Sequence, residues 1–194
     1  MTKPLLQIVT ASTRPTRTGG AIAAWTAELA RAHGGFEVEP VDLAELDLPL
    51  LDEPKHPVAG AYVHEHTRRW SATVQRAQAF VLVTPEYNHG YPAALKNALD
   101  CLSREWWYKA VGFVSYGGVS AGLRAVHQLK QVVTALRMVP VADAVSIPFV
   151  AERVGDEGGF RGDDALDAAA KRMFDELLSV GAPLTPLHVS PSAG

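Results

Sequence analysis

The chain of 194 residues, 47% hydrophobic and 20% charged, has the composition of one globular domain and is too short for two full ones. Its net charge of −3 and pI of about 6.1 argue against a protein whose main task is to grip nucleic acid or an anionic membrane, because both tasks need a basic face. The single cysteine, Cys101, excludes an intrachain disulfide, and with no signal-peptide core and no apolar run of ~18 residues we expect a soluble protein of the reducing cytoplasm.

The first half of the chain alternates predicted strands and helices. Strand-forming apolar runs occupy residues 5–10 and 36–41. The spacing of apolar residues predicts helices over 20–32 and 64–77, separated from one another by the second strand and by an irregular, acid-rich connection over 42–60.

The second half continues the alternation. Residues 79–84 are apolar on both faces, which is typical of a central strand in a parallel sheet. Pro92 fits the first position of a helix. A strand, a helix and a strand are predicted next, over 111–116, 121–137 and 139–147. Asp163 or Asp164 then caps a last amphipathic helix, whose apolar stripe reaches Leu178.

This alternation predicts an α/β fold, with a parallel sheet covered by helices on both faces and joined by right-handed crossovers. Five strands in one small domain favour the flavodoxin-like doubly wound order 2-1-3-4-5. We expect a single domain over residues 1–182 and a tail over 183–194.

Ligands of such sheets bind beyond the carboxyl ends of the strands, where the strand order reverses. Three loops should meet there, after Thr10, Thr84 and Tyr116. The first loop offers a phosphate the N-terminus of a helix, together with two arginines, Arg14 and Arg17. No acid precedes Glu28, so we expect nothing nearby to neutralise these arginines. A solvated turn with surface arginines stays open as the alternative.

The second and third loops suit a flat heteroaromatic ligand. Two prolines stiffen residues 84–92, while Asn88 and Gly90 tolerate unusual backbone angles. Residues 115–118, Ser-Tyr-Gly-Gly, let a backbone approach closely beside one aromatic ring. Neither a Walker loop nor a Gly-x-Gly-x-x-Gly fingerprint is present in the sequence.

The signature of the NADPH-dependent FMN reductases is very similar to the run TPEYNHGYPAALKNALD at residues 84–100. Their phosphate loop and third flavin loop resemble residues 11–17 and 115–118, and the likeness extends from about residue 5 to about residue 150. One departure is Ala11, where the family usually has glycine.

The resemblance implies a set of FMN-binding residues in three groups. The FMN phosphate would be surrounded by Ser12, Arg14, Arg17, Thr18 and Gly19. The isoalloxazine would be wrapped, largely through backbone groups, by Pro85, Glu86, Tyr87 and Asn88, and its other edge would be lined by Ser115, Tyr116, Gly117 and Gly118.

The implied activity is transfer of two electrons from NADPH or NADH through bound FMN to a small acceptor, by a ping-pong mechanism. Quinones, azo compounds, metal ions and free flavin all fit as acceptors, and no side chain is expected to be a catalytic acid, base or nucleophile. Two alternatives stay open. One is a flavodoxin-type electron carrier, although residues 16–20 match the carriers' phosphate loop only in part. The other is a reductase that supplies reduced FMN to a partner monooxygenase.

The other chemical side chains favour structural interpretations. His64 and His66 lie two apart, which is wrong for one helix face, and no metal site is expected. Cys101 is expected to be a packed small hydrophobe. Three adjacent aromatic residues, Trp106 to Tyr108, cannot all face one core, so part of this run should be exposed. The resemblance implies a homodimer, or a tetramer, in which a second chain closes one side of the flavin pocket. No nucleic-acid or membrane partner is expected.

Overall fold

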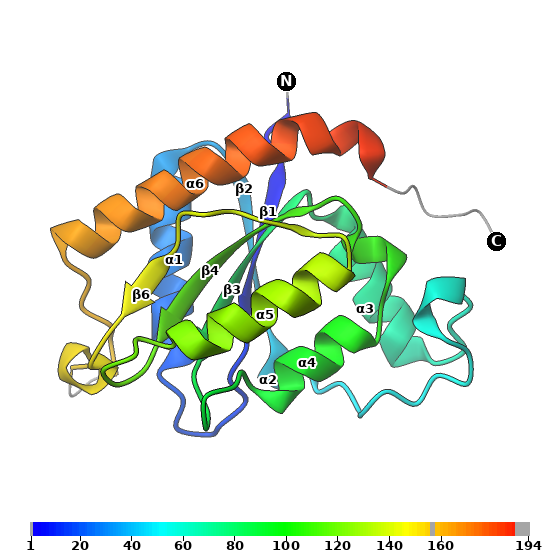
Figure 1. The fold of residues 1–194 in the computed structure, drawn as a ribbon, viewed down its shortest axis with the longest axis horizontal. Coiled ribbons are helices and arrows are strands. Elements are labelled where there is room, and N and C mark those ends of the chain that lie inside the picture. Colours follow the sequence, from blue (N-terminus) through cyan, green and yellow to red (C-terminus); the bar gives the residue numbers. More distant parts are fainter. Residues whose placement is uncertain (1, 156–157, 189–194) are drawn as a thin grey trace.

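A computed structural model describes residues 2–155 and 158–188. Its centre is a parallel sheet in the order β2-β1-β3-β4-β5, with β6 also paired to β4 (Figure 1). The strands are β1 (Leu5–Thr10), β2 (Glu37–Asp42), β3 (Ala79–Pro85), β4 (Ala110–Tyr116), β5 (Val139–Pro140) and β6 (Val145–Ile147). The predicted flavodoxin-like strand order is therefore confirmed.

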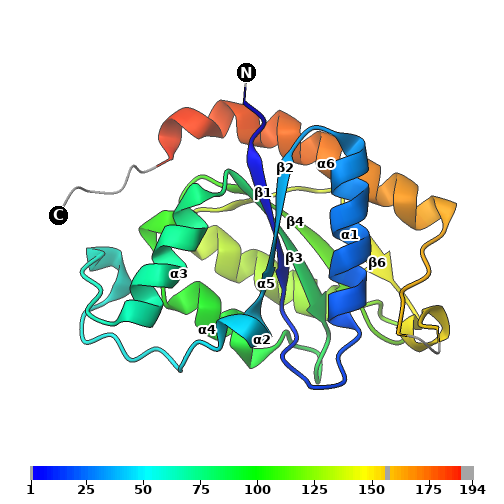
Figure 2. The same cartoon turned by 180° about the vertical axis from the view of Figure 1, so that it is seen from behind.

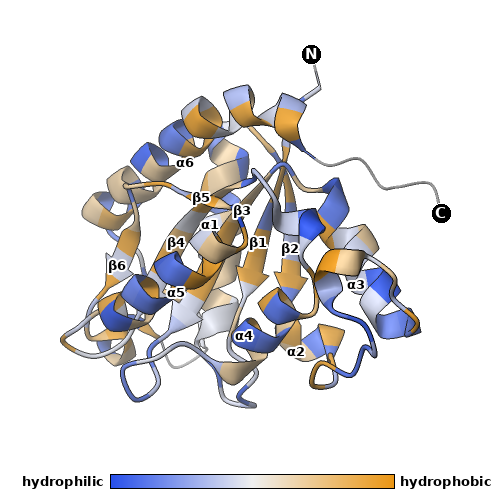
Figure 3. Ribbon diagram, turned by 45° about the vertical axis from the view of Figure 1, so that its right-hand side comes forward, coloured by the Kyte–Doolittle hydropathy of each residue, from blue (hydrophilic) through white to orange (hydrophobic). Residues whose placement is uncertain are grey.

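Helices cover both faces of the sheet, as predicted. One face carries α1 (Gly19–His33), which lies in front in Figure 2, and α6 (Asp164–Leu184), which is seen along its length in Figure 1. The other face carries α3 (Glu65–Arg76), α4 (Ala93–Asp100) and α5 (Leu123–Ala135). Apolar residues concentrate on the strands and on the helix sides that face them (Figure 3). The short helix α2 (Leu43–Leu46) follows β2 directly.

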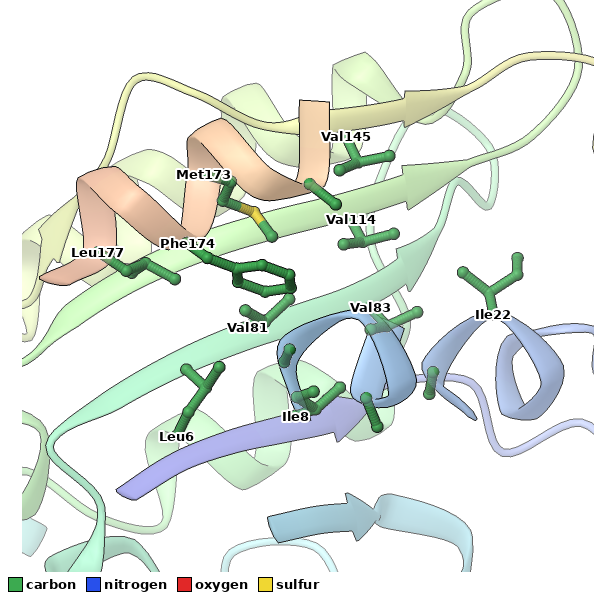
Figure 4. Close-up of a cluster of buried hydrophobic side chains, with 14 of the residues drawn as sticks. Leu6, Ile8, Ile22, Val81, Val83, Val114, Val145, Met173, Phe174 and Leu177 are labelled. Carbon is green, nitrogen blue, oxygen red and sulfur yellow. The ribbon is translucent and has the colours of Figure 1, made fainter. Parts of the chain in front are cut away.

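The two central strands hold the core together. Every residue of β3 and β4 is buried, because helices cover both faces of these strands. On the α1/α6 side, Val81 and Val114 pack with Met173 and Phe174 of α6 (Figure 4). Burying one such side chain stabilises the fold by roughly 1.5–3 kcal/mol. The loops at the carboxyl ends of β3 and β4 therefore begin from fully buried strands.

The predicted strand over 139–147 is wrong in one respect, because it is split into β5 and β6. The first part pairs Val139 with Ala110, and the second pairs Val145 with Val114. Between these parts, the backbone N–H groups of Ala142 and Asp143 donate to the carboxylate of Glu176 on α6, at 3.1 and 2.7 Å. A side chain from another element thus satisfies the donors that the strand ladder leaves unpaired.

Several predicted boundaries shift for local reasons. Helix α5 begins at Leu123 rather than 121, because Ala121 and Gly122 have positive φ values of 52° and 80°. Pro92 is the N-cap of α4 rather than its first helical residue. The predicted irregular connection contains α2 and a 3-10 turn, Pro57–Ala59. Helix α6 continues through Pro183 to Leu184, and of the predicted tail, residues 189–194 lie outside the described part of the chain.

The aromatic run and the single thiol are placed as follows. Trp106 is buried, whereas Trp107 and Tyr108 are partly exposed, and the Arg137 guanidinium lies 4.2 Å from the Trp107 ring. Cys101 is buried, and burial raises the pKa of its thiol to about 11. Within residues 2–155 and 158–188, no helix combines the length and apolar character needed to cross a membrane.

Candidate functional site

Three loops meet beyond the carboxyl ends of β1, β3 and β4. The register places Thr10 beside Val83, and Pro85 beside Tyr116, so the chain leaves all three strands at one edge of the sheet. The loops enclose a hollow of about 190 Å³. Its lining is Ser12, Arg14, Thr16, Arg17, Thr18, Pro85, Glu86, Tyr87, Tyr116, Gly117 and Val150. The predicted convergence of these loops is therefore present in the structure.

The first loop leads into the N-terminus of α1, and its two arginines differ. Arg14 is exposed, whereas the Arg17 Nη2 atom lies 2.6 Å from Oδ2 of Asp42 at the end of β2. The expectation that no acid lies near these arginines is therefore wrong for Arg17. Asp42 is 25 residues away in sequence, but β2 pairs with β1 and brings it beside the loop.

The polar groups around this loop fit a phosphate monoester. Arg17 Nε is buried and has no hydrogen-bond partner within the described part of the chain. A buried guanidinium N–H without a partner is costly, so an acceptor atom is needed there. The same hollow is lined by Arg14 and by the hydroxyl-bearing residues Ser12, Thr16 and Thr18. A phosphate would supply the acceptors and the negative charge that this donor set lacks.

The second loop is a tight hairpin. Tyr87 and Gly90 exchange backbone hydrogen bonds of 2.8 and 2.9 Å, and the two residues between them, Asn88 and His89, have φ values of 50° and 68°. Two successive positive φ angles are typical of a type I′ turn. The Tyr87 hydroxyl lies 2.6 Å from Ser12 Oγ, so the hairpin is bonded to the first loop.

Glu86 precedes the hairpin and is bonded to α5. Arg124 donates from Nε to Glu86 Oε1 at 2.6 Å and from its backbone N to Oε2 at 3.2 Å. Burial alone would raise the pKa of Glu86, but the hydrogen bonds from Arg124 and Ser120 outweigh this effect and keep the pKa below its usual value. The carboxylate is thus ionised and already partnered by Arg124.

The third loop packs against the first. A Cβ placed on Gly19 would lie 2.5 Å from the Tyr116 hydroxyl, so only glycine permits this close approach at the start of α1. Burial, reinforced by the neighbouring Tyr87, raises the pKa of Tyr116, which therefore stays a neutral phenol. The Ser115 hydroxyl donates to the Ala121 carbonyl at 2.8 Å and closes the loop on itself.

The structure separates the predicted site residues into two groups. Most of them line the hollow, whereas Gly19, Asn88, Ser115 and Gly118 do not. Two residues near the hollow, Val150 and Asp42, were not predicted from the sequence. Val150 reaches the hollow from the segment after β6, and its N–H donates to the Gly117 carbonyl at 3.0 Å. Asp42 could have been found, because it ends the strand predicted to lie next to the first loop.

A second, larger hollow begins on the other side of the first loop. It measures about 440 Å³ and is lined by Thr13, by α2 and its following residues, and by Ala93, Ala94, Asn97 and Ala98 of α4. The smaller hollow is the stronger candidate site, because it holds the arginines and hydroxyls. No group of three or more His, Cys, Asp or Glu side chains suited to a metal ion occurs among the described residues.

Comparison with known proteins shows the family of the chain. Residues 5–152 match the family of NADPH-dependent FMN reductases. The NAD(P)H-dependent FMN reductase C4B3.06c of Schizosaccharomyces pombe is 41% identical over 149 residues, covering 75% of this chain and 74% of that protein. The NAD(P)H:quinone oxidoreductase of Solanum tuberosum is 37% identical over 103 residues, covering 50% of each.

The fold has close structural counterparts. The flavoenzyme NAD(P)H:(acceptor) oxidoreductase FerB of Paracoccus denitrificans has a similar structure, with a TM-score of 0.74 over 91% of this chain and 98% of that one. Its sequence identity of 21% supports the fold alone. The matched range contains all three loops, and the FMN reductase family uses FMN and NAD(P)H. The chain therefore belongs to the NADPH-dependent FMN reductase family and is an oxidoreductase of that type.

Proposed function

We propose that the protein catalyses FMN-dependent transfer of two electrons from NAD(P)H to a small acceptor, with donor and acceptor binding in turn in a ping-pong sequence. The observation that carries this proposal is the hollow at the sheet edge. There Arg17 Nε, which has no partner among the described residues, and a cluster of hydroxyls lie beside a tight hairpin. The arginines and hydroxyls fit a phosphate, and the hairpin residues fit a planar ring.

The residues of the chain bind and orient the cofactor. The phosphate would be held by Arg14, Arg17, Ser12 and Thr18 at the N-terminus of α1, where the helix dipole favours an anion. The flat ring would lie against backbone groups of Pro85 to Tyr87 and of Gly117. FMN supplies the hydride chemistry that amino-acid side chains lack. Positioning and electrostatics are therefore the tasks of the protein.

A quinone is the acceptor that the comparisons favour. The relative from Solanum tuberosum is named for its quinone substrate. Azo compounds, metal ions and free flavin are the competing acceptors, and one open cofactor face would admit each of them. A cytoplasmic location remains a proposal, based on the single buried thiol of Cys101.

A homodimer, or a tetramer, is part of the proposal. Large apolar side chains are exposed around the site, with Val119 81%, Leu123 44% and Phe149 51% exposed. A second copy would cover apolar surface of this kind. Light scattering on a sizing column at micromolar protein should give twice or four times the mass of the chain, and a single monomer peak would contradict this assembly.

The direct test of the function is the visible spectrum of the purified protein. We expect flavin absorption bands that disappear when NADPH is added without oxygen and return when a quinone is added. Bleaching by NADPH alone distinguishes a reductase from a flavodoxin-type carrier, which would need a protein donor. A colourless protein that neither binds added FMN nor consumes NADPH would show the proposal to be wrong.

A further inference from the structure

The first two turns of α5 hold the second loop at two points, Glu86 and His89. At the first point, Arg124 bonds to the Glu86 carboxylate through both its guanidinium and its backbone N–H, and its Nη2 also donates to Ser120 Oγ at 2.9 Å. At the second point, Gln128 Nε2 donates to the His89 carbonyl at 2.9 Å. These contacts, which we name the α5 clamp, join residues 38 and 39 positions apart.

The contact at Glu86 is an ion pair with one buried member. The Glu86 side chain is 6% exposed and the Arg124 side chain is 47% exposed. A buried carboxylate is costly without its partner, so the loop cannot easily leave α5 while Glu86 is ionised. The contact fixes direction as well as distance, because Arg124 Nε and the helix N–H donate to the two different oxygens of the Glu86 carboxylate.

The clamped segment is strained. Asn88 and His89 both have positive φ, which asparagine tolerates but which costs free energy at histidine and persists there only where surrounding contacts impose it. His89 occupies the turn position that glycine favours in a type I′ turn. Its carbonyl is the group that Gln128 binds. The hydrogen bond from Gln128 therefore holds the backbone at His89, whose conformation is the least favourable in the turn.

The clamped loop also reaches the phosphate loop. Pro85, Glu86 and Tyr87 line the candidate cofactor hollow, and the Tyr87 hydroxyl is bonded to Ser12. A path of direct contacts thus runs from α5 through the hairpin to the first loop. Neither Arg124 nor Gln128 lines that hollow.

We propose that Arg124 and Gln128 are positioning residues of the flavin site, which hold the backbone of residues 86–89 in the geometry that receives the isoalloxazine ring. This inference rests on the proposed function and adds residues that do not touch the cofactor. It predicts that the clamp governs affinity for the ring, whereas the first loop governs affinity for the phosphate. Riboflavin, which has the ring without the phosphate, separates the two.

The experiment is a titration of apoprotein with FMN and with riboflavin, followed by quenching of flavin fluorescence. Arg124→Gln should weaken binding of both flavins by roughly 10-fold and leave the ratio of their dissociation constants unchanged. Arg124→Lys should recover part of the loss, since it restores the charge without the fork. Gln128→Ala should weaken both flavins by about 3-fold. Lys130→Gln is the matched control, because it removes a cation from the same helix outside the clamp.

A merely structural role would give a different result. In that case Arg124→Gln would lower the unfolding temperature while the folded protein bound both flavins as tightly as wild type, and this outcome would overturn the proposal. If Arg124→Gln does not fold, Gln128→Ala decides, because it leaves the ion pair intact, and unchanged affinity in that variant is equally contrary. In the double variant Glu86→Gln/Arg124→Gln, binding should be no weaker than in the worse single variant. Failure of the wild-type protein to bind FMN would instead contradict the proposed function.

Discussion

Arg17 and Asp42 form an ion pair, with Nη2 and Oδ2 2.6 Å apart, between the loop after β1 and the end of β2. The other carboxylate oxygen of Asp42 accepts from the backbone N of Ala44 at 2.9 Å and caps α2. Arg17 is thereby fixed from outside its own loop, whereas Arg14 is exposed to solvent. The two arginines of the phosphate loop therefore have different tasks.

Arg14→Ala should reduce cofactor affinity without affecting the fold. Because Arg14 would contribute only charge-assisted bonds to the phosphate, we expect FMN to bind roughly 10-fold more weakly. Riboflavin should bind as it does to wild type, and the unfolding free energy should change by less than about 0.5 kcal/mol. Fluorescence titration and urea unfolding of the apoprotein measure the two quantities. Unchanged FMN affinity would remove Arg14 from the site.

Arg17→Ala should reduce both affinity and stability. The substitution leaves the largely buried Asp42 carboxylate without its cation, which we expect to cost about 1–2 kcal/mol of unfolding free energy in urea. FMN binding should weaken at least as much as in Arg14→Ala. Arg14→Ala is the control for Arg17→Ala. Equal stability of the two apoproteins would contradict the stabilising role that we assign to the Arg17–Asp42 ion pair.

Gly19→Ala should disturb the contact between the first and third loops. The new methyl group would meet the Tyr116 hydroxyl at 2.5 Å, so we expect a loss of about 1–3 kcal/mol in unfolding free energy and weaker FMN binding. Gly20→Ala is a matched control, because a Cβ there meets nothing within 4 Å. That neighbour should gain about 0.5–1 kcal/mol of helix stability. Adding Tyr116→Phe to Gly19→Ala should restore part of the loss, and a harmless Gly19→Ala would refute the packing argument.

Lys109 should give the protein a pH-dependent stability at alkaline pH. Its Nζ donates to the carbonyls of Val74 and Gln75 near the C-terminus of α3, and burial lowers its pKa from 10.5 to about 7. Between these values the unfolded chain binds more protons, so the unfolding free energy should rise with pH across that window. We expect wild type to gain on the order of 3 kcal/mol over Lys109→Met between pH 7 and 10.5.

Urea unfolding at several pH values measures this difference. The imidazole of His188, whose pKa burial lowers, does not titrate within that window. Lys130→Met should follow the wild-type pH dependence, since Lys130 lies on α5 and is less buried. Parallel curves for wild type and Lys109→Met would show that Lys109 keeps an ordinary pKa.

The sequence alone predicted most of the elements, their order and the sheet edge where three loops meet. Local patterns were sufficient, because strands that are apolar on both faces, such as 79–84, require helices on both sides, and that requirement with five strands leaves few topologies. The compositions of the three loops then indicated a candidate ligand site at this edge. Strand patterns and loop compositions depend on residues that are close in sequence, so they can be recognised from periodicity and turn residues.

Only the tertiary structure decided which side chains pair across the loops. The partner of Arg17 lies 25 residues away and that of Glu86 lies 38 residues away. The first pair exists because β2 pairs with β1, and the second because the N-terminus of α5 lies beside the residue that follows β3. In the same way, Glu176 of α6 completes the hydrogen bonds of the split strand between β5 and β6. Charge pairing depends on distances of a few ångströms, whereas a sequence pattern specifies only which residues share a face or an edge.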